Sequence, residues 1–97
     1  MPRYIGLLQW TQKGIENIKD SPARVDAGRA AFQALGVELV DFYMVMGQYD
    51  MVVITEAPDE ETAVKATLAL GSQGSVRTET LRAFTEDEYR RLIAEMP

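Results

Sequence analysis

The chain has 97 residues and a formal net charge of −5, and it contains neither cysteine nor histidine. This length makes one domain, residues 1–97, and a composition that is 46% hydrophobic and 26% charged is typical of a globular protein. Without histidine and cysteine, zinc, copper, haem and iron–sulfur sites lose their usual ligands, and histidine-based acid–base catalysis is excluded. We therefore expect no metal and no cofactor.

The acidic balance also disfavours two classes of partner. No block of lysine or arginine is present, so binding to nucleic acid or to an anionic membrane surface is not expected. No apolar run approaches the roughly 20 residues of a membrane span. The first residues lack the layout of a signal peptide, and the lack of cysteine suits a cytoplasmic protein, which is the location we predict.

The first third of the chain predicts one strand and two helices. Residues 3–9 alternate in the manner of a strand, and residues 12–19 read as a short helix. A longer helix should begin at Ser21, with serine as the N-cap and proline at the first helical position, and should end at Leu35 before Gly36.

Residues 37–57 hold two apolar runs joined at the turn 47–50, which predicts a β-hairpin. Strict alternation places one set of side chains of the first run on one face: Val37, Leu39, Asp41, Tyr43 and Val45. The other face would then carry Glu38, Val40, Phe42, Met44 and Met46. Because both faces are largely apolar, the sheet should be covered on both sides.

The last third predicts a helix, a strand and a terminal helix. Acidic residues within 58–61 favour a helix start, and its buried side should hold Ala63, Val64, Thr67, Leu68, Leu70 and Gly71. Residues 75–84 read as a strand. Residues 85–88 form a capping box before a helix with an apolar stripe, made of Tyr89, Leu92, Ile93 and Met96.

The element order is therefore β-α-β-β-α-β with an extra C-terminal helix, an α+β ferredoxin-like fold with a four-stranded antiparallel sheet. Right-handed crossovers place both long helices on one face of this sheet. The opposite face is apolar too, so we expect a second copy to cover it, as in dimeric α/β barrels. The alternative cover is the C-terminal helix, which is short and is expected to reach an edge or a neighbour instead.

The turn carries a family resemblance. Gly47, Tyr49 and Asp50, with Gln48 between the first two, resemble the signature of the GYD-domain family of small bacterial and archaeal proteins. Further similar segments lie in order along the chain: Tyr4-Ile5 with Thr11, Gly14-Ile15, Ile18 to Pro22, Glu56 to Asp59, and Val76 to Thr80. The resemblance implies a single GYD-like domain with the fold of dimeric α/β-barrel proteins, and it implies no established activity.

Two pairs of residues near the sheet and its turn are candidates for ligand binding. Trp10 and Tyr43, with Tyr4, could line a pocket between the sheet and its cover, and the alternative is aromatic packing in a core or interface. Tyr49 and Asp50 follow the turn, where binding residues often lie. The alternative for them is structural, with the aspartate bonded to backbone amides and the tyrosine packed on the sheet end.

A third pair lies on the fourth strand. Arg77 and Glu79 are two residues apart and share a face, so the arginine could bind a carboxylate or phosphate. The alternative is a salt bridge between them or across strands.

The sequence leaves three functions open. The first is a small oligomeric module for ligand binding or regulation, with sites at subunit seams. The second is a cofactor-independent enzyme of the dimeric α/β-barrel type acting on a small organic molecule, which only an analogy of fold supports. The third is a structural or interaction domain. Whether the chain is an enzyme stays open at this point.

Overall fold

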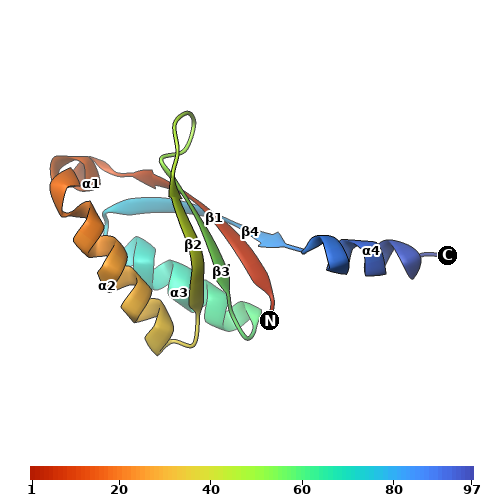
Figure 1. Cartoon of the computed structure of the whole chain (residues 1–97). Coiled ribbons are helices and arrows are strands. Elements are labelled where there is room, and N and C mark those ends of the chain that lie inside the picture. The colour runs from red at the N-terminus through yellow and green to blue at the C-terminus, as the bar shows by residue number, and fades with distance from the viewer.

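The computed structural model describes residues 1–97 and has the expected order of elements (Figure 1). The strands are β1 (Arg3–Trp10), β2 (Glu38–Met44), β3 (Met51–Glu56) and β4 (Val76–Ala83). The helices are α1 (Gln12–Glu16), a short 3₁₀ turn (Ile18–Asp20), α2 (Ser21–Ala34), α3 (Glu60–Ser72) and α4 (Glu86–Ala94). The predicted α+β fold with an additional C-terminal helix is confirmed.

The four strands form one antiparallel sheet in the order β2-β3-β1-β4. Helices α2 and α3 lie side by side on the same face of this sheet, as right-handed crossovers require (Figure 1). Not one of the helices combines the length and the apolar character that crossing a membrane needs.

The core lies between the sheet and these two helices. Tyr4 and Leu8 of β1 are 6% and 5% exposed, and Val53 of β3 is also buried, in agreement with the predicted alternation. Phe32 of α2 and Ala66 of α3 pack against them from the helix layer. The core is small, because only 11 of 97 residues are buried.

Helix α3 turns only part of the predicted side to the sheet. Ala63 and Ala66 are buried, and Leu70 packs on the core, whereas Val64 is 55% exposed and Leu68 is 66% exposed. The small alanines let the helix backbone approach the sheet closely, so the helix is rotated away from its larger apolar side chains.

The start of α2 also differs from the prediction. The 3₁₀ turn Ile18–Asp20 leads directly into the helix, so Ser21 is its first residue and not its N-cap. Asp20 occupies the cap position without a side-chain bond to the helix. The predicted helix over residues 12–19 is accordingly split, with α1 ending at Glu16.

A β-bulge changes the facing of side chains along β2. Leu39 pairs with Thr55, but Asp41 pairs with the next residue of β3, Ile54, so Val40 is an extra residue. The prediction of strict alternation across the strand is therefore wrong beyond Val40. Phe42 lies on the helix side with Leu39, and Tyr43 therefore faces the opposite side of the sheet.

The side of the sheet away from α2 and α3, called the open face below, is not covered in this chain. Its centre consists of Ile5, Leu7, Val52, Ile54, Tyr43 and Leu81. Tyr43 is 56% exposed, and Leu81 is 44% exposed. The guanidinium of Arg3 forms an ion pair of 2.5 Å with Glu56 across β1 and β3.

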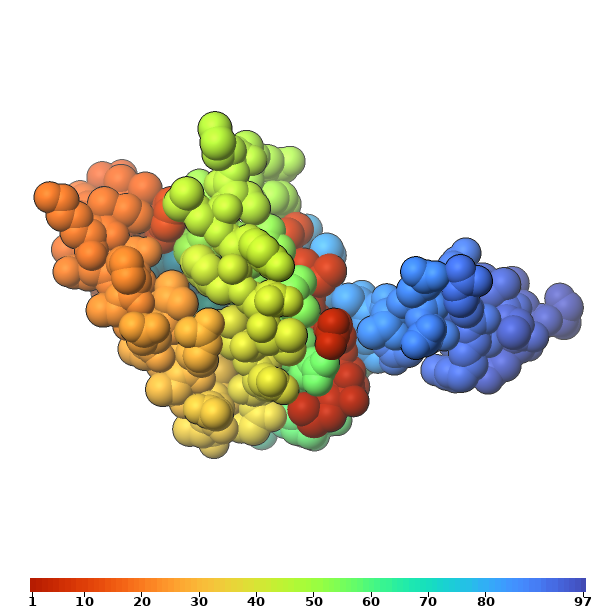
Figure 2. All heavy atoms as spheres, viewed as in Figure 1, coloured from red at the N-terminus to blue at the C-terminus, as the bar shows by residue number.

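Helix α4 does not fold back over the open face. It continues outward from the end of β4 and projects away from the body of the molecule (Figure 1). The space-filling view shows the same separation, with the terminal segment standing apart from the rest of the chain (Figure 2). The alternative cover considered from the sequence is therefore excluded in this structure.

Helix α1 is fastened to the start of β4 at a very close approach. The hydroxyl of Thr11 accepts from the Gly14 amide at 3.2 Å, and the Thr11 amide donates to the Ser75 carbonyl at 3.0 Å. A Cβ atom placed on Gly14 would lie 2.2 Å from that same carbonyl oxygen. Only glycine fits here without moving the backbone.

Gly14→Ala should lower the free energy of unfolding by about 2–3 kcal/mol, because the added methyl group meets a backbone carbonyl. Urea unfolding at one fixed protein concentration measures this change. Gly28→Ala is the matched control: a Cβ there has nothing within 4 Å, and alanine favours the interior of α2 by about 0.5–1 kcal/mol. Equal effects of the two substitutions would contradict the close approach.

Candidate functional site

The loop between β2 and β3, residues 45–50, forms a hairpin loop that extends beyond the body of the sheet (Figures 1 and 2). The Val45 amide donates to the Asp50 carbonyl at 2.8 Å and closes the loop. Gly47 has a φ of +119°, a conformation that other residues rarely adopt. At the tip, Met46 is 96% exposed.

Asp50 braces this hairpin loop against the end of β1. Its amide donates to the Leu8 carbonyl at 2.9 Å, and its carboxylate accepts from the Trp10 amide at 2.9 Å. Both bonds go to the backbone of β1 and extend its pairing beyond Met51, the first residue of β3. The structural alternative stated for Asp50 from the sequence is thus the arrangement found.

Below the hairpin loop, on the open face, lies a hollow of about 140 Å³, called the hairpin depression below. Its walls come from β1, the loop and β4: Leu7, Gln9, Gln48, Tyr49, Arg77, Thr78 and Glu79. The side-chain amide of Gln9 donates to the backbone carbonyl of Gln48 at 2.8 Å. The Tyr49 hydroxyl donates to the Glu79 carboxylate at 2.5 Å and ties the loop to β4.

Arg77 contributes a positive charge to the hairpin depression. The pairing of Arg77 with Glu79, one of the sequence alternatives, is not formed, because Glu79 accepts from Tyr49 instead. The four ion pairs of the chain are Arg3–Glu56, Arg29–Asp26, Arg90–Glu86 and Arg91–Glu95. The Arg77 guanidinium therefore has no anionic partner within the chain.

The bond between Tyr49 and Glu79 changes the titration of the phenol. Donation to the Glu79 carboxylate raises the pKa of Tyr49, and the negative charge of that carboxylate adds to the effect. The hydrogen-bonded pair keeps its proton on the tyrosine near neutral pH.

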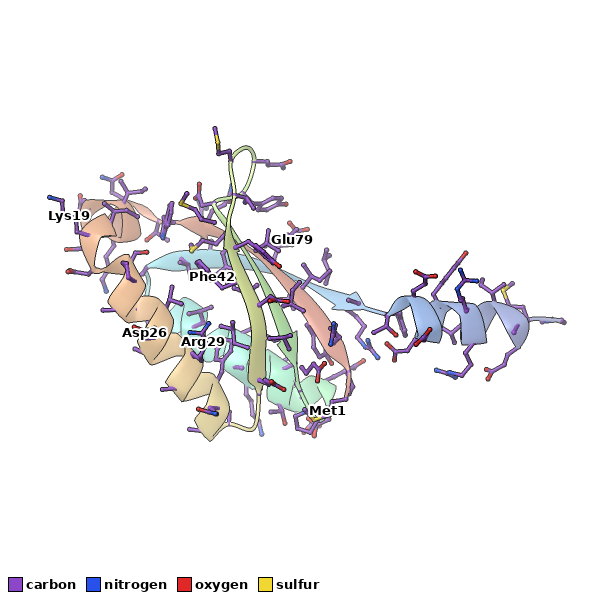
Figure 3. All side chains as sticks on the ribbon, viewed as in Figure 1. Met1, Lys19, Asp26, Arg29, Phe42 and Glu79 are labelled. Atoms are coloured by element: carbon purple, nitrogen blue, oxygen red, sulfur yellow. The ribbon has the colours of Figure 1, made fainter.

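Trp10 and Tyr43 do not share a pocket. Trp10 lies on the helix side, beside Val25 and Phe42, whereas Tyr43 pairs with Val52 on the open face. Figure 3 shows the two sides of the sheet, with Phe42 toward α2 and Glu79 away from it near the hairpin loop. The predicted aromatic pocket formed by both residues is therefore wrong.

A second hollow, of about 70 Å³, lies between α2 and the sheet and was not predicted. It is mainly apolar, and its walls include Leu8, Trp10, Val25, Phe32, Leu39, Phe42 and Leu70. The signal in the sequence was the glycine at position 28, which leaves space on the sheet side of α2. Because this hollow is lined mainly by core side chains, we interpret it as loose packing of the core.

The two carboxylates with shifted pKa values serve helix starts. The amide of Thr62 donates to Asp59 and lowers the pKa of that carboxyl, and the amide of Thr85 does the same for Glu88. Asp59 is the N-cap of α3, and Glu88 is the N3 residue of the capping box that Thr85 begins at α4. No group of three or more acidic side chains is placed to share a metal ion.

A comparison with protein families decides the classification. The model of the GYD domain matches residues 4–93, which is nearly the whole chain. The chain belongs to the GYD-domain family. The hairpin loop and the hairpin depression thus include the tyrosine and aspartate of the family signature.

A characterised relative and a solved structure extend this comparison. The GYD chain is 39% identical over 84 residues to the "Glutamine synthetase and cystathionine beta-lyase binding protein" of Thermus thermophilus, covering 86% of this chain and 88% of the relative. It is also similar to the crystal structure of TTHA0845, a protein of the same organism. That match has a TM-score of 0.58 and 28% identity, covering 88% of this chain and 95% of the other.

In this GYD domain, the Tyr49 phenol should titrate above the ordinary tyrosine pKa of about 10, and Glu79→Gln should bring it back toward that value. Because the pKa is raised in the folded state, the stability from this bond is present below about pH 10. It is lost as the pH rises through the folded-state pKa. The difference in tyrosinate absorbance between the wild type and Tyr49→Phe isolates this one phenol. An unshifted titration in the wild type would show that the bond is absent.

Proposed function

We propose that this GYD-domain protein is an oligomeric regulatory module that acts by binding another protein through its hairpin loop. The single observation that carries the proposal is Met46, which is 96% exposed at the tip of a projecting loop. An exposed methionine on a braced loop is a favourable anchor for a partner surface, because methionine adapts its shape to many contacts.

The loop is held in place before any partner arrives. Asp50 bonds to the backbone of β1 at both its amide and its carboxylate, and Tyr49 bonds to Glu79 of β4. A preordered loop loses little conformational entropy on binding, so more of the contact energy appears as affinity.

The partner we propose is a metabolic enzyme. Support comes from the Thermus relative, whose name describes binding to glutamine synthetase and cystathionine beta-lyase, and which matches this chain over most of both lengths. We place this activity in the cytoplasm, a location that remains a prediction from the composition.

Association of the chain with itself is the second part of the proposal. The apolar centre of the open face, which includes Leu7 and Ile54, would be covered by the open face of a second copy, as in dimeric α/β barrels. Each buried aliphatic side chain would contribute roughly 1.5–3 kcal/mol. The hairpin depression lies at the margin of that face and would then open at the seam between subunits.

A small anionic ligand in the hairpin depression is the third part. Arg77 has no anionic partner, and its planar guanidinium suits a carboxylate or phosphate group. A ligand bound there would lie directly below the hairpin loop that contacts the enzyme. Arg77 is therefore the candidate residue for the anionic group, and the bonded pair of Tyr49 and Glu79 would accept a hydrogen bond from a donor group elsewhere on the ligand. Asp50 has a bracing role.

Met46→Glu should weaken binding to glutamine synthetase or cystathionine beta-lyase by tenfold or more, because a charge would be placed in an apolar contact at the loop tip. Biolayer interferometry with each purified enzyme measures the dissociation constant. Leu68→Glu, on the exposed side of α3 and 66% exposed, is a control with the same change of charge. Equal weakening by both variants, or no binding by the wild type, would refute the docking of the loop.

Native mass spectrometry of the untagged protein tests the oligomer and the ligand together. The wild type should form a dimer or a multiple of it and carry a reproducible small-molecule mass. Ile54→Glu should shift the protein to monomer because it buries a charge in the sheet contact, whereas Val64→Glu on α3 should not. Arg77→Ala should keep the oligomer and lose the added mass.

These outcomes test the self-association and the ligand site separately. A wild-type monomer at micromolar concentration would refute the association of open faces. An oligomer that binds its ligand equally well with and without Arg77 would refute the assigned ligand site.

A further inference from the structure

Helix α4 carries an apolar stripe that nothing in its own chain covers. Tyr89 is 57% exposed, Ile93 is 52% exposed and Met96 is 64% exposed, and Leu92 lies among them. The helix packs extensively against no other element and stands apart from the body (Figures 1 and 2). Phe84, in the two-residue link from β4, adds a fifth exposed side chain.

Helix α4 has a strong N-terminal cap but is too short to be stable in isolation. Thr85 and Glu88 form a complete capping box, and Arg90 pairs with Glu86 one turn away. Such features add about 1 kcal/mol or less each, whereas isolated helices shorter than about 12–15 residues are marginal in water. A helix of nine residues with one apolar side therefore gains its stability from a surface that covers that side.

We infer that α4 is an arm that packs its apolar stripe against a second copy of the chain, and that it extends the proposed contact between open faces. The arm begins close to that face, since Leu81 of β4 belongs to the open face and α4 begins at Glu86, five residues further along the chain. The inference thus rests on the association proposed above and adds the element that completes it.

The area of the sheet supports this inference. Four strands about 4.8 Å apart, with lengths of six to eight residues at about 3.3 Å per residue, present a face of only about 500 Å². Stable protein interfaces bury about 800 Å² on each partner. The five large side chains of the link and arm would supply on the order of 300–500 Å² more, which closes the difference.

Charge does not oppose this arrangement. The acidic residues of α4 lie mainly in its first turn, at Glu86, Asp87 and Glu88, where they complement the helix dipole. The stripe itself holds no charged residue, because Tyr89, Leu92, Ile93 and Met96 follow the helical spacing. The arm can therefore bury this side without desolvating an ion.

The decisive comparison is Leu92→Glu against Ala94→Glu in the full-length protein. Both add one negative charge to α4, but position 94 lies on the side of the helix opposite the stripe. A dimer contains two arms, so Leu92→Glu should weaken dimerisation at least about a hundredfold by sedimentation equilibrium. Ala94→Glu should change it less than about threefold.

Cleavage by trypsin after Arg90 and Arg91 gives an independent measurement on the same proteins. The wild type should be cut slowly at concentrations where it is a dimer and quickly on dilution, and Leu92→Glu should be cut quickly at both. A Leu92→Glu dimer of wild-type affinity, or a wild-type dimer whose arm is cut as fast as in the monomer, would overturn the inference. If Ile54→Glu abolished dimerisation while Leu92→Glu did not, the contact between open faces would stand without the arm.

Discussion

The right-handedness of the two β-α-β crossovers determines which side of the sheet the helices cover. Because both crossovers are right-handed, α2 and α3 cover the same side of the sheet, and the chain has no third long helix for the other side. That other side is nevertheless built from aliphatic residues such as Leu7 and Ile54. The hairpin depression, the hairpin loop and the arm all lie at the margins of this uncovered face, so its occupation governs each of them.

Within the family signature, neighbouring residues have different tasks. Asp50 bonds to the backbone at two points and sets the base of the loop, so its carboxylate is already engaged. Tyr49 bonds to a side chain, and the partner carboxylate of Glu79 can exchange that bond for another donor. Gly47 supplies the backbone conformation that allows the turn. Bracing of the loop by Asp50 and the bond of Tyr49 to β4 are thus divided over a single four-residue turn.

Elements with strong local signals were predictable from the sequence. The capping box at Thr85 and Glu88, the helix end at Gly36 with a φ of +83°, and the alternation of β1 all appear as expected. The bulge at Val40 was not, because an extra residue leaves no local signature and is chosen by the pairing with β3. The wrong placement of Tyr43 beside Trp10 in one pocket follows from that bulge, which turns Tyr43 to the open face.

The candidate site was predictable in part for a similar reason. Period-two spacing was enough to put Arg77 and Glu79 on one face, and the turn chemistry brought out Tyr49 and Asp50. Glu79 bonds to Tyr49 because the hairpin loop lies against β4, and this position depends on tertiary contacts that the local sequence does not report. The rotation of α3 was likewise decided by how closely Ala63 and Ala66 let the helix approach the sheet, and no helical periodicity reports that distance.

The small core makes association a matter of stability as well as of function. Only 11 of 97 residues are buried in the single chain, while large apolar side chains such as Met46, Leu68 and Ile93 are more than half exposed. Domains of this size bury only about 60% of the surface of the unfolded chain, so their stability is marginal. Surface covered by a second copy then adds directly to the free energy of folding. The proposed oligomer would respond to protein concentration, because the contacts between its subunits would also stabilise the fold of each subunit.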